Sequence, residues 1–421
     1  MYVEIISIGD ELLNGQVVNT NAAWLGQQLN AAGFPVSRIT TVPDVVQEIV
    51  NALEEARKRA DITIATGGLG STPDDVSLTA AMRFFQTNLH EDPHIAADIL
   101  AFFTNLGRNP DPDHLARALV PDNCIPLRNV NGLVPGLFFP ENEKITAFLP
   151  GVPYEMEPMF NEQLLPRLLP MLKTRVQTRT LVTTGLPESR IDVYTKDIQE
   201  EFPEVRFAFL PATTGVRIRI TSPPTTANSD VSLLDRCEAA LRERLRPFII
   251  GSGTITLEEA VGKLLAERGL TLAVAESCTG GLIGDRITDV SGSSRYFQAD
   301  VVAYSNKSKI DLLRVPVETI EAHGAVSGET ALALAEGIRA ATGADFGLST
   351  TGIAGPTGGS PEKPVGLVWI GFAAGDKAHA FRYRLGADRR RVKERAAQAA
   401  LDIVRRHLLD FPYHPRPEME R

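Results

Sequence analysis

The chain has 421 residues, a net charge of −9 and three cysteines, a length sufficient for two or three domains that each bury a core of their own. The acidic balance disfavours direct binding to nucleic acid, and the scattered Cys124, Cys237 and Cys278 argue against a disulfide framework and for a reducing, cytoplasmic compartment. The first residues lack a basic leader and no window approaches the roughly 18 apolar residues of a membrane span, so we expect a soluble protein without a membrane partner.

Residues 1–170 alternate strand-like and helical runs, which is typical of βαβ units around a mainly parallel sheet. We expect strands at "EIISIG", "PVSRITTV" and "DITIATGG", and helices at "TNAAWLGQQLNAAG" and "VVQEIVNALEEARKRA". Thr20 or Asn21 is predicted to cap the first of these helices, and Gly33 is predicted to end it.

Three loops of this domain, "SIGDELLNG", "TVPDVVQEI" and "TGGLGSTPDDVS", carry polar residues after strands. The backbone N–H groups of Gly67, Gly68 and Gly70 are expected to cradle a phosphate. Carboxylates beside a phosphate site suggest a hard divalent cation that bridges protein and substrate oxygens. The candidate residues for metal binding or water activation are Asp10, Glu11, Asp44, Asp74 and Asp75. The alternative is a capped turn without a ligand.

Residues 171–252 predict a small α+β domain with an antiparallel hairpin in "VRFAFLPATTGVRIRITS". They contain no catalytic cluster, so we expect a linker or a dimerisation module. Residues 253–412 alternate again and predict a second α/β domain, in which "PVGLVWIGFAA" and "HAFRYRL" pair before a basic closing helix. The predicted fold is therefore two three-layer α/β domains with mainly parallel sheets, joined by a small α+β domain.

Polar residues follow three strands of the C-terminal domain, where the carboxyl ends of parallel strands form a ligand crevice. Ser277 follows the first strand, and free N–H groups of Thr279, Gly280 and Gly281 could bind an oxyanion. Cys278 competes with it as nucleophile, because a thiol at a helix N-terminus can be acidic. A simple helix cap is the alternative to both.

The three loops contain no histidine, so a lysine is the remaining candidate for the base that activates a serine. Lys307 and Lys309 both follow the second strand, and their spacing does not choose between them. Tyr304 would relay or position the proton. An ordinary aromatic residue and a solvated helix lysine are the alternative reading.

The segments "AESCTGG", "YSNKSK", "HGAVS", "TTGIAGPTGGSPEKPVG" and "ADRRRV" together resemble the C-terminal domain of the CinA family, which is similar to stand-alone nicotinamide mononucleotide deamidases. The resemblance implies that Ser277 is the nucleophile, with Lys309 as base and Tyr304 beside them. It implies hydrolysis of the carboxamide to nicotinate mononucleotide and ammonia, without a cofactor. The implied substrate-binding residues are Thr279, Gly280, Gly281, Thr351, Gly352, Gly355 and, among the three arginines 389–391, most simply Arg389.

The N-terminal loops, with "FLPGVPYEM", resemble the molybdopterin-binding fold of molybdenum-cofactor biosynthesis proteins and of full-length CinA proteins, and residues 171–252 look like the KH-like domain of that family. The resemblance implies cleavage of ADP-ribose to AMP and ribose 5-phosphate with Mg, Mn or Co, in a homodimer. One alternative is a deamidase whose N-terminal domain only binds a nucleotide or a molybdopterin. Another is an accessory protein of DNA uptake, which the acidic charge disfavours.

Overall fold

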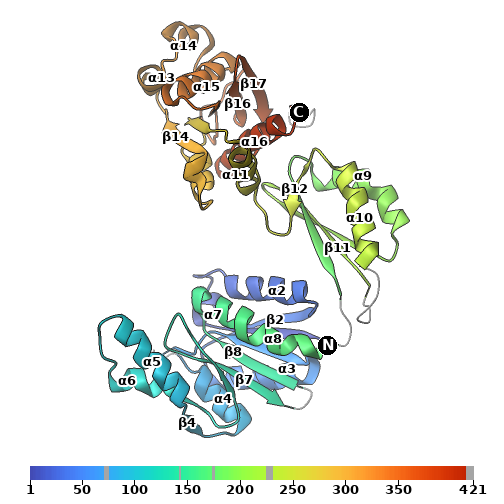
Figure 1. The fold of residues 1–421 in the computed structure, drawn as a ribbon, viewed down its shortest axis with the longest axis vertical. Coiled ribbons are helices and arrows are strands. Elements are labelled where there is room, and N and C mark those ends of the chain that lie inside the picture. Colours follow the sequence, from blue (N-terminus) through green and yellow to red (C-terminus); the bar gives the residue numbers. More distant parts are fainter. Residues whose placement is uncertain (71–74, 142–143, 173–175, 224–230, 414–421) are drawn as a thin grey trace. The chain divides into compact units, whose positions relative to one another are not determined.

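The structure is a computed structural model, and it describes residues 1–70, 75–141, 144–172, 176–223 and 231–413. The chain forms two compact units (Figure 1). The first is Met1–Thr178, and the second combines Arg179–Ser222 with the chain beyond residue 230. The predicted middle domain therefore shares a unit with the C-terminal domain. Among the described helices, none is both long enough and apolar enough to cross a membrane.

A six-stranded sheet, with strand order β2-β1-β3-β8-β7-β6, forms the centre of the first unit. The first four strands of this order run parallel. Strand β7 is antiparallel to β8, and β6 is antiparallel to β7. The carboxyl ends of the parallel strands therefore share one edge, where their loops meet. The strands are β1 (Val3–Ile8), β2 (Val36–Val42), β3 (Ile62–Thr66), β6 (Ile125–Leu127), β7 (Gly136–Glu141) and β8 (Lys144–Leu149).

Helices cover both faces of this sheet because its strands alternate their side chains between two cores. In β1, Val3 and Ile5 enter one core, and Ile6 and Ile8 enter the other. Figure 1 shows the resulting three layers. The first core is covered by α2 (Thr20–Ala32), α7 (Pro153–Met159) and α8 (Leu165–Leu168), and the second by α3 (Val46–Arg59) and α4 (Ser77–Phe85).

The ends of α2 show where the predicted caps were right and wrong. Gly33 ends the helix with φ +95°, as predicted. Asn19, not Thr20 or Asn21, caps its beginning: the Asn19 side chain accepts the N–H of Ala22 at 3.1 Å. The amide oxygen of Asn19 satisfies the same backbone donors that a hydroxyl would, so the helix begins at Thr20.

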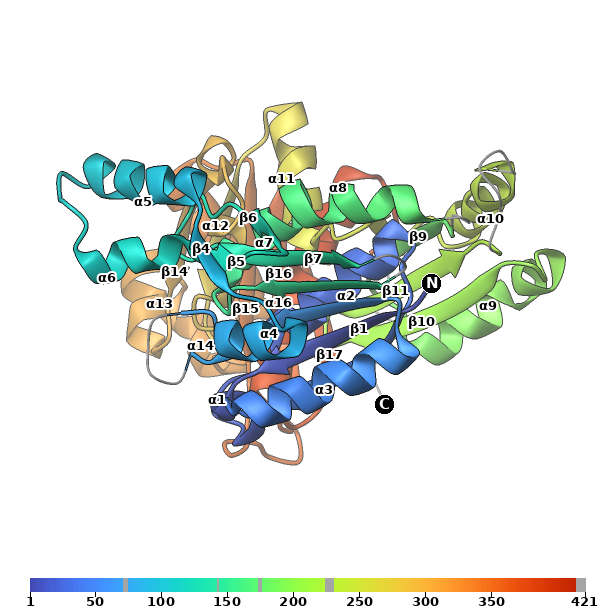
Figure 2. The same ribbon diagram turned by 90° about the horizontal axis from the view of Figure 1, so that it is seen from below.

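Residues 92–118 form an excursion from the first unit that we call the helical insertion. It contains α5 (Pro93–Asn105), the short α6 (Pro112–Leu115) and a 3-10 turn (Ala116–Ala118), between the antiparallel strands β4 (Leu89–Glu91) and β5 (Leu119–Pro121). Its own core comprises Ile95, Ile99, Phe103 and Ala118. Figure 2 shows the insertion at the end of the sheet where the short helix α1 (Asp10–Leu13) lies.

The second unit begins with the predicted small α+β domain. Its sheet has the order β10-β11-β9-β12, and β10 and β11 form the predicted antiparallel hairpin. Two helices, α9 and α10, close a single core over this sheet. The elements are β9 (Thr178–Thr183), α9 (Glu188–Glu201), β10 (Arg206–Ala212), β11 (Gly215–Thr221), α10 (Val231–Arg244) and β12 (Ile249–Ser252).

The C-terminal domain contains a five-stranded sheet in the order β14-β13-β15-β16-β17. The first three strands of this order are parallel, and β16 and β17 form the predicted antiparallel pair. Helices α11, α12 and α16 cover one face, and α13, α14 and α15 the other. The strands are β13 (Leu272–Glu276), β14 (Phe297–Val302), β15 (Phe346–Gly352), β16 (Leu367–Ala374) and β17 (Lys377–Arg384).

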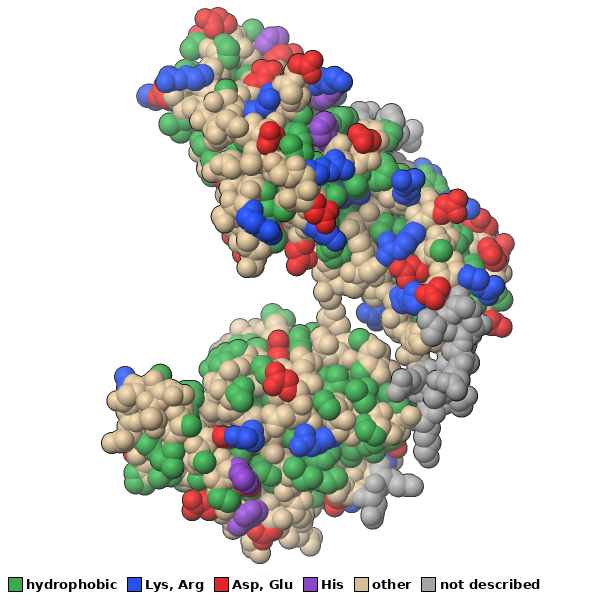
Figure 3. Space-filling model, in the orientation of Figure 1, with side chains coloured by type: hydrophobic (Ala, Val, Ile, Leu, Met, Phe, Trp, Pro, Cys, Tyr) green, Lys and Arg blue, Asp and Glu red, His purple; other side chains and the backbone are tan. Residues whose placement is uncertain are grey.

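The helices of this domain are α11 (Leu257–Arg268), α12 (Leu282–Thr288), α13 (Asn306–Leu313), α14 (Val317–His323), α15 (Gly328–Thr342) and α16 (Arg389–Leu408). Helix α14 was not predicted, because its seven residues are too few to show a helical period. On the face that Figure 3 shows, acidic and basic side chains of the second unit are interspersed.

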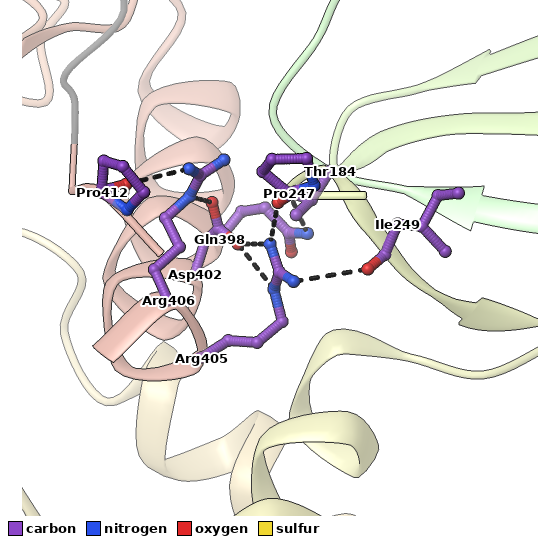
Figure 4. A network of polar contacts seen from close by, with 8 residues as sticks. All are labelled: Thr184, Pro247, Ile249, Gln398, Asp402, Arg405, Arg406 and Pro412. Carbon is purple, nitrogen blue, oxygen red and sulfur yellow. Dashed lines mark hydrogen bonds and ion pairs between the residues drawn. The ribbon is translucent and has the colours of Figure 1, made fainter. Parts of the chain in front are cut away.

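Helix α16 joins the two parts of the second unit through a buried polar network (Figure 4). Arg405 is 1% exposed and donates to the carbonyls of Pro247 at 2.6 Å and Ile249 at 3.3 Å. Asp402 accepts hydrogen bonds from both Arg405 and Arg406, at 2.8 and 2.7 Å. The carboxylate offsets the charge of the buried guanidinium, and the two carbonyls attach α16 to the small domain.

Candidate functional site

Ser277 and Lys309 are brought together at the carboxyl edge of the C-terminal sheet. Ser277 directly follows β13 and is 8% exposed, and Lys309 lies in the first half of α13, which Ser305 caps. The Nζ atom of Lys309 lies 3.1 Å from the Oγ atom of Ser277. Lys307 instead turns outward and pairs with Asp311. The structure thus separates two lysines that the sequence alone left open.

Burial of Lys309 shifts its amine toward the neutral form. The side chain is 1% exposed, and burial lowers the pKa of its ammonium group below the ordinary lysine value. Its Nζ donates to the carbonyls of Ala303 at 2.9 Å and Tyr304 at 3.1 Å. A neutral amine has two N–H bonds and one lone pair, so the carbonyls occupy both bonds and the lone pair is left for Ser277. Such a lysine can accept the proton of the serine.

Cys278 is buried against the domain core, and its thiol is a weak acid. Desolvation by burial raises the pKa of Cys278 to about 12, so at neutral pH the sulfur keeps its proton. A protonated thiol is a poor nucleophile. The geometry therefore favours Ser277 over Cys278, which the spacing of the residues could not decide.

The turn after Ser277 exposes backbone donors. Gly280 and Gly281 have φ of +61° and +86°, a left-handed backbone that favours glycine. In the described part of the chain, no acceptor occupies the N–H groups of Thr279, Gly280 or Gly281. The hydroxyl of Thr279 is buried and lies 2.6 Å from that of Thr350. The contact between Thr279 and Thr350 thus fixes the turn, while its backbone N–H groups stay available. Contact of these residues with a substrate stays a prediction.

A buried carboxyl pair, which was not predicted from the sequence, supports this turn. Glu276 is fully buried, and one of its oxygens accepts the N–H groups of Ile283 at 2.7 Å and Gly284 at 2.9 Å. Burial, and then the charge of Glu276, raise the pKa of Asp300 on β14 to about 8. Asp300 therefore holds a proton at neutral pH.

Tyr304 and Arg389 meet at the rim of the site. Tyr304 is 62% exposed, and its hydroxyl accepts a hydrogen bond from Arg389 at 3.3 Å. Arg389 also donates to the carbonyl of Gly355 at 2.9 Å. Among the described contacts, the Tyr304 hydroxyl touches neither Ser277 nor Lys309. Its proton-relay role stays a prediction, while its backbone carbonyl already positions the lysine.

Arg389 is the arginine of the 389–391 run that reaches the loops. Arg390 instead bonds Glu394 at 2.6 Å on the helix surface. Lys393, which the sequence reasoning overlooked, lies one turn after Arg389, and a Cβ added to Gly280 would come within 3.5 Å of its Nζ. The sequence does contain a signal for Lys393: it follows Arg389 by four residues, a spacing that places both cations on the same face of a helix.

Thr351 and Gly352 shape the third loop. The hydroxyl of Thr351 is buried and donates to the carbonyl of Ala325 at 2.6 Å. A Cβ added to Gly352 would lie 2.6 Å from the carbonyl oxygen of Leu367, so only glycine fits beside β16. Both residues thus have structural roles here, and their contact with substrate stays a prediction.

A separate cavity of about 960 Å³ lies in the first unit, where the loops after β1 and β3 meet. The loop Pro150–Glu155, from the segment "FLPGVPYEM", also lines it. Asp74 lies outside the described residues. The other predicted residues all line this one cavity: Asp10, Glu11, Asp44, Asp75, Gly67, Gly68 and Gly70.

The carboxylates of this cavity are close enough to perturb one another. The N–H of Asp10 donates to Asp44 at 2.9 Å. Burial raises the pKa of Asp44, and the charges of Glu11, Asp10 and Asp75 raise it further. A hard divalent ion takes carboxylate oxygens and would relieve this repulsion, so the donor set fits one. Within the described ranges, however, no three acidic, histidine or cysteine side chains are arranged as a metal-ligand group.

The backbone N–H of Gly67, which was expected to bind a phosphate, is already used inside the sheet. Its N–H donates to the carbonyl of Leu149 at 3.2 Å, because the pairing of β3 with β8 extends by one residue. This N–H is therefore not free for a phosphate. Gly68 has φ +65°, and a Cβ there would lie 2.6 Å from the hydroxyl of Ser77, so the turn needs glycine. Phosphate binding by Gly68 and Gly70 stays a prediction.

Three known families match the chain in succession. Residues 4–170 match "Probable molybdopterin binding domain", residues 178–251 match "Damage-inducible protein CinA KH domain", and residues 254–408 match "CinA C-terminal domain". Among solved structures, the competence/damage inducible protein CihA from Agrobacterium tumefaciens is 38% identical, over 36% of this chain and 93% of that chain, with a TM-score of 0.35.

Full-length relatives are similar along the whole chain. A CinA-like protein of Salinibacter ruber is 42% identical over 97% of this chain and 100% of its own length. A CinA-like protein of Kosmotoga olearia is 40% identical over 97% of this chain and 99% of its own length. With three matching domains in the same order and relatives that align from end to end, the chain belongs to the CinA family.

Proposed function

We propose that the chain is a bifunctional hydrolase of pyridine nucleotides. Its C-terminal domain hydrolyses the carboxamide of nicotinamide mononucleotide, and its N-terminal domain cleaves ADP-ribose to AMP and ribose 5-phosphate. The observation that carries the proposal is the buried pair in which the Nζ of Lys309 lies 3.1 Å from the Oγ of Ser277. Both substrates are breakdown products of NAD, which makes the fusion chemically coherent.

In the proposed amidase, Ser277 attacks the carboxamide carbon while Lys309 takes the hydroxyl proton. Burial shifts the lysine toward its neutral form, in which its two carbonyl partners direct the lone pair toward the serine. The carbonyl oxygen of the substrate gains negative charge beside the free amides of Thr279, Gly280 and Gly281. Amides fixed in this way stabilise an oxyanion without reorganisation.

The same lysine completes the proposed cycle. Lys309 returns the proton to the leaving nitrogen, the carbon–nitrogen bond breaks, and ammonia departs from an acyl ester on Ser277. Water then attacks the ester and gives its proton to Lys309. Lys309 passes that proton to the Oγ of Ser277 as the ester bond breaks, which releases nicotinate mononucleotide. Arg389 and Lys393, one helical turn apart, would hold the phosphate of the substrate at the rim. No cofactor is needed in these steps.

In the proposed pyrophosphatase, ADP-ribose enters the cavity of the first unit. Asp10, Glu11, Asp44 and Asp75 would hold a divalent cation such as Mg²⁺, Mn²⁺ or Co²⁺. Such an ion, when bound, neutralises charge on phosphate oxygens and lowers the pKa of a bound water. The raised pKa of Asp44 among neighbouring carboxylates supports this assignment. The proposed partners are small nucleotides and a second copy of the chain, in the cytoplasm.

The decisive experiment gives purified full-length protein nicotinamide mononucleotide and, separately, ADP-ribose, with and without a chelator. We expect ammonia release that resists the chelator and AMP release that the chelator stops. Ser277→Ala should stop only the ammonia, and Asp44→Asn only the AMP, because the two sites lie in different units. Absence of ammonia from the wild-type protein under all conditions contradicts the amidase.

The family description of residues 4–170 supports a second candidate, in which only the amidase is active and the N-terminal domain binds a nucleotide or a molybdopterin. This candidate predicts no AMP with Mg²⁺, Mn²⁺ or Co²⁺. It also predicts stoichiometric ligand binding by a protein whose ammonia release is normal. AMP production that Asp44→Asn abolishes excludes it.

A further inference from the structure

The cavity of the first unit has an uneven charge. Five carboxylates line it, from Asp10, Glu11, Asp44, Asp75 and Glu155. Among the described residues that line it, Arg117 is the only lysine, arginine or histidine. A nucleotide with a phosphate or pyrophosphate is itself anionic, so acidic walls alone repel it. Arg117 is the one cationic side chain on these walls that can attract such a ligand directly.

The helical insertion, not the sheet, delivers Arg117 to this cavity. Arg117 lies in the 3-10 turn that ends the insertion, next to the buried Ala118. Ala118 packs with Ile99 and Phe103 of α5 in the small core of the insertion. In the view of Figure 2, α5 and α1 lie on opposite sides of the same end of the sheet. The arginine and the acidic loop after β1 thus come from different elements that converge on the cavity.

The guanidinium of Arg117 has unused hydrogen-bonding capacity. Its Nε atom is buried and has no hydrogen-bond partner among the described residues. A buried charged donor without a partner is destabilising, so such groups are seldom retained without a function or a ligand. Coverage of apolar surface by the side-chain stem is the competing explanation, because arginine often does this. The two explanations differ in what a change of the head group does to ligand binding.

We propose that Arg117 is the anion-binding residue of the N-terminal cavity and donates to a phosphate of the nucleotide. This inference rests on the proposed pyrophosphatase for the identity of the ligand, ADP-ribose. The Nε and one Nη of a guanidinium form a planar fork that matches two oxygens of one phosphate. Arg117 thereby selects phosphate-bearing ligands, while the carboxylates proposed above would hold the divalent ion. The insertion is thus a specificity element of this domain.

Binding measurements on the full-length protein in Mg²⁺ test this role with probes that are not turned over. The probes are AMP, inorganic pyrophosphate and adenosine, which lacks a phosphate. Arg117→Gln should weaken AMP and pyrophosphate roughly tenfold or more, the effect of losing a charge-assisted hydrogen bond, and leave adenosine unchanged. Arg117→Lys keeps the charge without the fork and should restore part of the affinity.

Arg108→Gln is the matched control, because Arg108 belongs to the same insertion, is exposed and does not line the cavity. It should bind all three probes as the wild-type protein does. Thermal unfolding of Arg117→Gln should match or exceed that of the wild type, since the change removes a donor that lacks a partner. If Arg117→Gln does not fold, Arg117→Lys is measured instead, and it must then bind AMP more weakly than the wild type.

The outcomes separate this inference from the proposed function. Arg117-dependent binding of AMP and pyrophosphate without any cleavage of ADP-ribose refutes the pyrophosphatase and supports the anion site. Equal binding by the wild type and Arg117→Gln overturns the anion site even if ADP-ribose is cleaved. Failure of the wild type to bind either anionic probe overturns it as well.

Discussion

Ser277 and Cys278 are neighbours on one turn, yet their side chains meet different surroundings. Ser277 contacts the Lys309 amine, whose pKa burial lowers, whereas the Cys278 thiol is buried with its pKa raised to about 12. We expect Ser277→Ala to reduce ammonia release from nicotinamide mononucleotide by at least about 10³-fold, as nucleophile removal does in related serine chemistry. Its affinity for the nucleotide should stay near the wild-type value. Cys278→Ala should lose less than about tenfold, through packing alone.

Rate and equilibrium binding measured on the same two variants check this expectation. A Cys278→Ala protein as inactive as Ser277→Ala would point to the thiol. Ammonia release by Ser277→Ala at the wild-type rate contradicts the serine mechanism outright.

Lys309 gives the reaction a pH dependence whose sign follows from its burial. The base must be neutral, and burial lowers its pKa from the ordinary value of 10.5. Activity is therefore low below the lowered pKa and rises with pH as the amine loses its proton. We expect kcat/KM for the amidase to rise with a slope of one proton and then level off below pH 10.5. Lys309→Arg should be inactive at every pH, because a guanidinium stays protonated.

A pH profile of kcat/KM for the wild type and Lys309→Arg provides the measurement. Recovery of Lys309→Arg at high pH would assign the base to another group. The same profile for Lys307→Arg is the control, since Lys307 lies on the surface and pairs with Asp311. That variant should retain the wild-type profile.

The sequence alone predicted the loop positions of the site residues but not the contacts among them. "AESCTGG" placed a serine, a cysteine and two glycines at a strand end, because strand and turn patterns are local. The choice of Lys309 over Lys307 depends on which helical face meets the strand end. Glu276 and Asp300 are partners only because β13 and β14 pair in the sheet. Contacts of this kind depend on tertiary structure, which no local pattern records.

At the scale of elements, we expect the buried carboxyl pair of Glu276 and Asp300 to make the free energy of unfolding depend on pH. Asp300 has an ordinary pKa of 3.8 and a folded pKa of about 8. Between these pH values the folded protein holds a proton that the unfolded chain releases, so the free energy of unfolding falls as pH rises. The slope for one group is at most about 1.4 kcal/mol per pH unit. Above about pH 8 the folded group also ionises and this contribution ends.

Asp300→Asn removes the titrating proton and keeps a donor for Glu276. We expect its free energy of unfolding to depend less on pH than that of the wild type between pH 5 and pH 8. Denaturant unfolding of both proteins at the two pH values measures the difference. Parallel curves for the two proteins would show that Asp300 does not hold the proton.

Most long elements could be predicted, and the short ones could not. The apolar run in "EIISIG" and the helical pattern of "VVQEIVNALEEARKRA" produce β1 and α3 as expected. The helical insertion was missed, because β4 and β5 have three residues each and pair across the whole of α5 and α6. Arg117 was missed with it, since no local pattern connects that turn to the glycine run.

At the scale of the second unit, we expect Arg405 to couple the unfolding of its two parts, because it hydrogen-bonds both of them. Arg405→Met removes the donors for Pro247 and Ile249 and leaves Asp402 with Arg406 alone. Breaking a buried ion pair typically costs about 3–5 kcal/mol. We expect denaturant unfolding to shift by this order and protease cleavage of the small domain to begin earlier.

Arg390→Met is the control for that change, because Arg390 forms an exposed pair with Glu394 on the same helix. Such a pair contributes only about 0.3–0.5 kcal/mol. Similar unfolding of Arg405→Met and wild type, with unchanged protease sensitivity, would show that the buried network does not join the two parts.

Helix α16 contacts the loop at Gly355 through its first residue, and it contacts the small domain through its last turns. Arg389 and Arg405 are about 24 Å apart along it, at 1.5 Å of rise per residue. A helix packed along most of its length behaves as a stiff rod, so a displacement at one end reaches the other nearly undiminished. A bulkier side chain wedged beside Pro247 would therefore move Arg389 relative to the glycine turn. It would alter the distance between Ser277 and Arg389, the proposed nucleophile and phosphate-binding residue, without contacting either of them.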